Sequence, residues 1–383
     1  MIYTQKELEN NENQVLAPYG NRSRDSKGRV YPEQRSLNKT NYQIDRDRIQ
    51  HTHAFQRMGF QSQVLFSWKN NKPRTRLAHA FEVVQTSRTI ARALGANEDL
   101  VEAICLAREL GNTAFGPAGE PVLARLMKDY GLFDYRINSL KIITTGKRIS
   151  LEFPGINPTW ELREGIVKLD PPINSHEASE YNPDLRAHLE SQIASAAYTI
   201  TSDAFDLVDG LSSKIIPLEA LEGLTIWEIM MEGNRSNSSG INKLSIQWLL
   251  RSLIDYLISD LLQATEQNIL DNKISSPPDI QHLSYNIVTF STDMHRRIRQ
   301  LRDFLYTNLY NHQLVIRKVN IAEKIFSELF EAYQSEPVLL PGNSKDRINE
   351  IGLEQTICEH LAGLSDHTIV FEHKKLFDPS TML

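Results

Sequence analysis

Apolar side chains recur at helical intervals along most of this chain. The clearest stretch runs from residue 75 to Gly95, where Leu77, Phe81, Val84 and Ile90 fall along one side of a helix. A helix with one apolar side buries that side against a core. The spacing therefore predicts a packed helix over residues 75–95.

The next predicted helix carries its own start and stop signals. Asn97 is a residue type favoured at an N-cap, and acidic residues occupy the following turn, where the helix dipole stabilises negative charge. Gly111 supplies a C-terminal stop. The sequence predicts a helix between Asn97 and Gly111.

The same periodicity predicts helices over residues 185–207, 218–232, 243–269, 293–333 and 354–364. Polar or proline-containing loops interrupt the pattern at 170–183 and 271–279, and residues 63–74 indicate a small hairpin or a loop. Strand-rich regions and internal repeats do not stand out. The predicted fold class is all-α.

Three regions are expected along the chain. Residues 1–44 are polar and turn-rich, which predicts an extended N-terminal arm. Residues 45–270 are predicted to form a helical core. Residues 271–383 are predicted to form a C-terminal helical region packed on that core as one unit.

Composition excludes several classes of protein. The chain has 383 residues, 40% hydrophobic and 23% charged, so a disordered or fibrous protein is excluded. The net charge of −6 argues against a dedicated nucleic-acid binder. Two cysteines suit a reducing compartment, and the polar N-terminus shows no signal peptide. No apolar run approaches the roughly 18 residues of a membrane span, so we expect a cytoplasmic protein without membrane partners.

Three segments, 44–64, 74–120 and 358–378, together resemble the deoxyguanosine triphosphate triphosphohydrolase (dGTPase) family of the HD-domain superfamily. The match is collinear over nearly the whole chain and includes residues 16–33. The resemblance implies an all-helical HD-domain bundle and an activity that cleaves a dNTP to deoxynucleoside and triphosphate. It also implies oligomers, often hexamers, with nucleotide-dependent regulation.

The metal-binding pattern of that family is degenerate here. The family supplies a His, an adjacent His-Asp pair and a distant Asp, which match His79, Arg108-Glu109 and Tyr198 in this chain. A guanidinium is a permanent cation without a lone pair to donate, so it cannot ligate a metal. A neutral phenol is a poor substitute for a carboxylate.

The position of the family's catalytic His is occupied by Pro117, which has no titratable group, although Glu120 of the same segment is retained. His79 is then the one expected ligand left unchanged, and a single imidazole does not hold a divalent cation in water. We therefore predict no intact metal site, no catalytic residue set and no cofactor.

Residues that contact nucleotide in the family are partly retained. The resemblance assigns phosphate contact to Arg76 and contacts near the sugar to Gln63 and Asp206, whereas Ser202 replaces the aromatic residue that packs the sugar. Phosphate binding without metal is physically reasonable, because arginine offers bidentate, charge-assisted hydrogen bonds.

A structural interpretation stands beside this one. Arg76 and Arg108 would then pair with nearby acids such as Glu109 and Glu120, in a network that replaced the metal, and His79 would be a core histidine.

The leading hypothesis is an inactive dGTPase-like protein that acts by binding. It would form a homo-oligomer or pair with an active paralogue, with a dNTP as candidate effector. One rival is a residual dNTP triphosphohydrolase using His79, Glu109 and Glu120 around a weakly held Mn or Mg ion. The other is a single-stranded nucleic-acid-binding module that uses the basic cluster at 295–302.

Overall fold

A computed structural model describes residues 2–63, 74–169, 172–173, 176–232, 246–342 and 344–382. The chain forms two compact units, each assembled from three separate stretches. The first unit comprises Met1–Asp47, Phe81–Cys105 and Asn157–His312, and the second comprises Arg48–Ala80, Leu106–Ile156 and Gln313–Leu383. The described residues contain helices and two isolated bridges, which confirms the all-α fold class. None of the described helices has the length and apolarity needed to cross a membrane.

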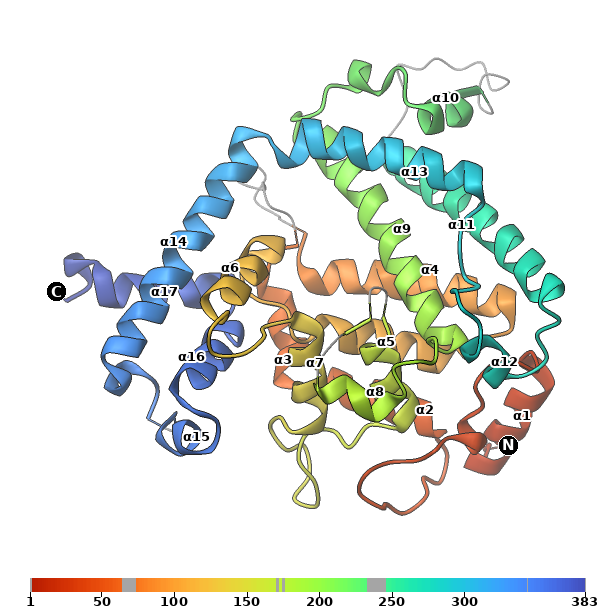
Figure 1. The fold of residues 1–383 in the computed structure, drawn as a ribbon, viewed down its shortest axis with the longest axis horizontal. Coiled ribbons are helices and arrows are strands. Elements are labelled where there is room, and N and C mark those ends of the chain that lie inside the picture. The colour runs from red at the N-terminus through yellow and green to blue at the C-terminus, as the bar shows by residue number, and fades with distance from the viewer. Residues whose placement is uncertain are drawn as a thin grey trace. The chain divides into compact units, whose positions relative to one another are not determined.

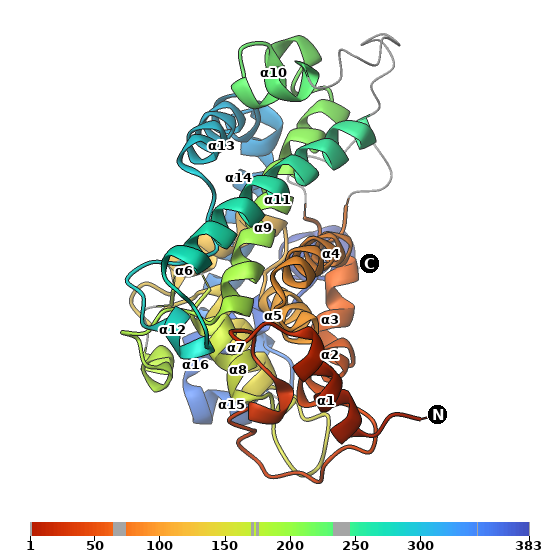
Figure 2. The ribbon, with the colours of Figure 1, turned by 90° about the vertical axis from the view of Figure 1, so that its right-hand side faces the viewer.

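The first unit is built around two long helices. These are α9 (Leu189–Ser212) and α11 (Ile246–Asp271), which pack side by side along their lengths (Figures 1 and 2). α13 (Thr292–Leu305) packs on α9, and α10 (Thr225–Glu232) packs on α13. The other helices wholly within this unit are α1 (Gln5–Val15), α8 (Trp160–Val167) and α12 (Pro277–Gln281).

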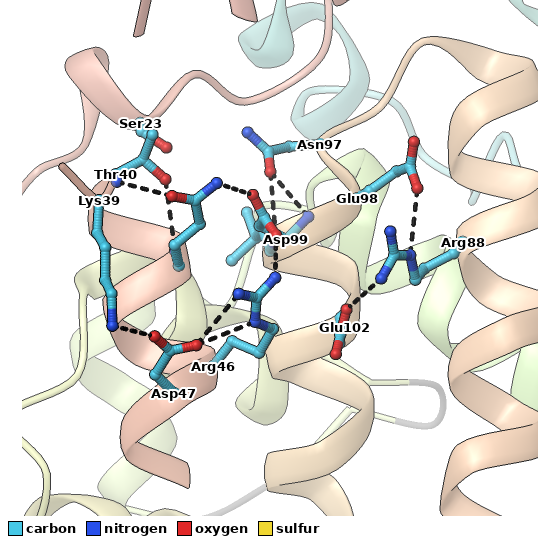
Figure 3. A network of polar contacts seen from close by, with 12 residues as sticks. Ser23, Lys39, Thr40, Arg46, Asp47, Arg88, Asn97, Glu98, Asp99 and Glu102 are labelled. Carbon is cyan, nitrogen blue, oxygen red and sulfur yellow. Dashed lines mark hydrogen bonds and ion pairs between the residues drawn. The ribbon is translucent and has the colours of Figure 1, made fainter. Parts of the chain in front are cut away.

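Three helices begin in one unit and end in the other: α2 (Asn41–Gln50), α4 (Arg76–Leu94) and α5 (Glu98–Glu109). Their first-unit parts are joined by polar contacts that Figure 3 shows. Arg46 on α2 bonds Asp99 on α5, while Arg88 on α4 bonds Glu98 and Glu102 on α5. These half-buried ion pairs fix the register of three neighbouring helices.

The N-terminal segment is not simply the extended arm that the sequence predicts. Residues Gln5–Val15 form α1, which begins with a capping box in which Thr4 and Glu7 bond each other's backbone. Beyond α1 the segment is held by buried carboxylates, because Glu190 accepts hydrogen bonds from the backbone and side chain of Asn21. Because α1 is polar, apolar spacing did not predict it, although the capping box at its start is formed by residues next to one another in the sequence.

The second unit has its own hydrophobic core. It contains α3 (His53–Arg57), α6 (Gly119–Leu126), α7 (Tyr135–Thr144), α14 (Gln313–Ser335), α15 (Ser344–Ile351), α16 (Leu353–Ala362) and α17 (Asp366–Phe377). The long helix α14 packs against α6, α16 and α17 (Figure 1). Phe326, Leu329 and Leu361 are among the fully buried side chains between them.

Most long helices lie where periodicity predicts them. The predicted helix over 75–95 is α4, and the one between Asn97 and Gly111 is α5, with the Asn97 side chain accepting from the backbone of Asp99 and Leu100. The single helix predicted over 293–333 is instead two, because a π-helical turn at Tyr306–Tyr310 separates α13 from α14. The loop or hairpin predicted at 63–74 lies largely outside the described residues.

The linear division of the chain at residues 44 and 270 stays a prediction about domains. The compact units cut the chain elsewhere and interleave its stretches.

Candidate functional site

A buried ion pair joins the start of α4 to the end of α5 in the second unit. The Arg76 guanidinium donates to a carboxylate oxygen of Glu109 at 2.8 Å, and the two side chains are only 2% and 1% exposed. Arg76 is positioned by its backbone N–H, which donates to the carbonyl of Gln61. The expected pairing of Arg76 with a nearby acid is therefore found with Glu109.

Glu109 has further donors around it. The Asn112 amide donates to the same oxygen at 3.0 Å, and Nε of Arg108 lies 3.8 Å from the other oxygen. The Arg108 guanidinium also lies over the ring of Tyr135, 5.7 Å from its centroid. α5 can end this close to α7 because Gly111 lacks a Cβ, which would lie 2.0 Å from the Tyr135 carbonyl oxygen.

His79 lies one turn along α4 from Arg76 and is buried, with 1% of its surface exposed. The pKa of His79 is lowered to about 4, mainly by burial; the Glu109 carboxylate opposes this shift, and the guanidiniums around the imidazole add to it. The imidazole is therefore neutral at physiological pH. The burial of His79 agrees with the structural interpretation, in which it is a core histidine.

These residues do not fit a divalent cation. A metal needs carboxylate and imidazole lone pairs turned toward one point, yet Glu109 already accepts from Arg76, and Arg108 places a second positive charge beside it. Within the described parts of the chain, no three His, Cys, Asp or Glu side chains are grouped closely enough to hold a metal ion.

Pro117 is exposed and lies in a 3-10 turn, Gly116–Ala118, that precedes α6 and whose other two residues are buried. Phe115 and Gly116 before it both have left-handed backbone, with φ of 64° and 60°. Asp366 at the start of α17 holds this turn, since its carboxylate accepts from the backbone N–H groups of Phe115 and Ser62. Sequence reasoning missed Asp366, because nothing near it in the sequence indicates so distant a partner.

Glu120 follows on α6 and accepts, at 3.4 Å, a hydrogen bond from the backbone of Tyr135. Burial raises the pKa of Glu120, and the nearby charge of Asp134 raises it further. A carboxyl group with this environment holds its proton more readily than an exposed one.

Gln63 precedes the part of the chain that the structure leaves undescribed. Its backbone N–H donates to the carbonyl of Arg74 at 3.0 Å. This bond and the adjacent bridge between Ser62 and Thr75 bring the Gln63 segment beside the start of α4. The backbone of Gln63 therefore lies close to the start of α4, which begins at Arg76.

Tyr198 and Asp206 both lie on α9, in the first unit. Tyr198 is partly buried. The Tyr310 hydroxyl donates to Asp206, and Asp203, on the same helix, pairs with Arg302 at 2.9 Å. The carboxylates near Tyr198 therefore have partners of their own.

The basic cluster on α13 is largely engaged. Arg296 pairs with Asp293, Arg302 pairs with Asp203, and Arg297 donates to the hydroxyl of Tyr256. These contacts weaken the interpretation of α13 as a nucleic-acid surface, because a phosphate backbone would have to displace the acids.

Comparison with known proteins gives a consistent result. Residues 288–375 match a family model described as "Phosphohydrolase-associated domain". The chain is 36% identical to a protein of Geobacter sulfurreducens over 95% of both chains. It is also 36% identical to a protein of Deinococcus radiodurans over 98% of this chain and 100% of that one.

Both relatives are named deoxyguanosinetriphosphate triphosphohydrolase-like proteins, the second with the number 1. A protein of Ralstonia pickettii with the same name is 36% identical over 94% of each chain. The class of protein is defined by three observations: the all-helical fold, the phosphohydrolase-associated segment and the similarity over nearly the full length of the relatives. This chain belongs to the dGTPase-like family of HD-related proteins.

Proposed function

We propose that this chain has lost the metal-dependent hydrolysis implied by its family and acts by binding. It would serve as an oligomeric or regulatory subunit, assembled with itself or with an active paralogue, that responds to a dNTP. The observation that carries the proposal is the buried Arg76–Glu109 pair. It sets a guanidinium against a carboxylate where the family resemblance calls for a metal ligand.

The charge around His79 supports the same conclusion. Three arginines act on this imidazole, and each would also repel a divalent cation. Pro117 supports it independently, because no proton can be taken or given at that position.

The first test is elemental metal analysis of the purified full chain together with a dGTP hydrolysis assay containing manganese. We expect no stoichiometric metal and no triphosphate release above a protein-free control. Metal near one ion per chain, with turnover abolished in His79→Ala, would instead establish the residual hydrolase.

The second test concerns nucleotide binding through Arg76. Direct removal of Arg76 would leave Glu109 buried and unpaired, so the comparison is between Glu109→Gln and the double variant Arg76→Gln/Glu109→Gln. Loss of a charge-assisted contact to phosphate is expected to weaken dGTP binding by about tenfold in the double variant. Titration calorimetry measures this, and equal affinities in the two variants would show that Arg76 does not contact the nucleotide.

A further inference from the structure

The first unit contains a pocket with mostly apolar walls, to which α9, α10 and α11 all contribute. Its volume is about 360 Å³, and it is lined by the end of α9, the segment that follows, α10 and the start of α11. Figure 2 labels these three helices. We call it the apolar pocket; its apolar lining residues include Leu211, Ile216, Leu218, Trp227, Ile246 and Leu249.

The turn that ends α9 builds one wall of the apolar pocket. The backbone N–H groups of Ile215 and Ile216 both donate to the carbonyl of Gly210, at 3.1 and 3.0 Å. A Cβ at Gly210 would lie 2.6 Å from Cδ1 of Ile216, so the glycine leaves room for Ile216 to pack against α9. Ile216 is 1% exposed. Packing therefore fixes this wall in place.

Other walls of the apolar pocket are open to solvent. Leu218 and Ile246 are 41% and 39% exposed, and Trp227 is half-buried. Burial of such side chains by an apolar ligand is favourable, because it removes their surface from water. The volume lies within the range of about 300–1,000 Å³ that is usual for small-molecule sites, and mostly apolar walls with few polar groups are also usual there.

Lys214 is the one charged side chain among the described residues that line the apolar pocket. It follows the C-cap of α9 with left-handed backbone, at a φ of 60°, and its N–H donates to the carbonyl of Leu211 at 3.0 Å. The side chain is exposed, and no ion pair joins it to another described residue. A single positive charge beside apolar walls favours a ligand with an apolar body and one negative charge.

We infer that the apolar pocket binds a small amphipathic carboxylate, with its apolar chain against Trp227 and its carboxylate beside Lys214. A carboxylate carries one negative charge, which one ammonium group complements. A phosphate monoester carries about −1.5 to −2 at neutral pH and would need more donors than this lining offers. The inference goes beyond the proposed function, because it requires neither loss nor retention of hydrolysis.

The test is calorimetric titration of the full chain with decanoate at neutral pH, below the concentration at which decanoate forms micelles. Decyltrimethylammonium carries the same chain with the opposite charge and should bind more weakly. Lys214→Met keeps a side chain of similar length and removes the charge. It is expected to weaken decanoate binding by about fivefold and to leave binding of the cation no weaker.

Lys273→Met is the matched control. Lys273 is also exposed, follows a long helix of the same unit with left-handed backbone, at a φ of 53°, and lies outside the apolar pocket. Its removal makes the same change in net charge, so decanoate affinity should stay within about twofold of that of the unmodified chain. Lys214→Gly removes the charge and also suits the left-handed backbone, so weaker binding in this variant cannot be assigned to a loss of stability.

The apolar walls are tested by shortening the ligand. Octanoate has two methylene groups fewer than decanoate and should bind about tenfold more weakly. A decanoate brominated at its far end should quench the fluorescence of Trp227, and Trp227→Phe should remove most of that quenching while retaining decanoate binding.

Absence of decanoate binding, equal affinity for the cation, or equal weakening in Lys214→Met and Lys273→Met would overturn the inference. Adsorption of the chain to phosphatidylcholine vesicles that decanoate does not reverse would overturn it in favour of a membrane surface. No lining residue of the apolar pocket belongs to the Arg76–Glu109 pair. A chain that hydrolyses dGTP and also binds decanoate through Lys214 would therefore reject the proposed function and retain this inference.

Discussion

Replacing Glu109 with alanine is expected to lower the free energy of unfolding by about 3–5 kcal/mol. The change leaves the Arg76 guanidinium, which is 2% exposed, without its carboxylate partner. It also removes one of the two acceptors of the Asn112 amide, whose other acceptor is the backbone carbonyl of residue 109. Urea denaturation at neutral pH measures the loss as a shift in midpoint at constant slope.

The double variant Arg76→Met/Glu109→Leu separates the cost of an unpaired charge from the value of the pair. Because both charges are removed together, its stability should lie much closer to that of the unmodified chain. Asp293→Ala provides an exposed comparison, since Asp293 and Arg296 are 65% and 75% exposed and their pair contributes about 1 kcal/mol or less. A small effect of Glu109→Ala would show that Arg76 does not depend on this carboxylate.

The second large effect is a loss of stability in acid that originates at His79. In the folded chain its pKa is lowered to about 4, against an ordinary value of 6.5. Between these pH values the unfolded chain binds a proton at His79 that the folded chain does not bind. The free energy of unfolding therefore falls as the pH falls from 6.5 toward 4. The full contribution is about 3 kcal/mol, and it is constant above pH 6.5.

His79→Gln should remove this part of the pH dependence. Urea denaturation of both chains at pH 7 and at pH 4.5 gives the comparison, and the unmodified chain should lose more stability by about 2–3 kcal/mol. His79→Leu is expected to behave like His79→Gln. Adding EDTA should leave the result unchanged, whereas a chelator-sensitive difference would mean that His79 ligates a metal.

Local signals accounted for much of the helical structure. Asn97 caps α5 through its own side chain, and the apolar spacing that defines α4 is set by residues within the helix itself. Apolar spacing does not predict a helix that is polar on all sides. The capping box of Thr4 and Glu7 marks the start of α1, although the helix that follows is too polar to show an apolar side.

The degenerate metal pattern was also visible without a structure. The inability of Arg108 to donate a lone pair and the lack of a titratable group in Pro117 are properties of the residue types alone. Aligning those positions with a family was sufficient to predict that the expected ligands are missing. These two properties follow from the residue type and hold whatever the neighbours in space.

Which contacts these positions make was decided only by the tertiary structure. Arg76 and Glu109 are 33 residues apart, and their pairing depends on how α4 and α5 meet. A groove of the second unit likewise collects residues from His51 to Thr368, and no local pattern indicates that they share one surface. Burial lowers the pKa of His79 and sets the energy of the Arg76–Glu109 pair, and it arises from packing between distant segments. The sequence alone therefore determines which chemical groups are present, whereas the fold determines which of them are buried next to one another.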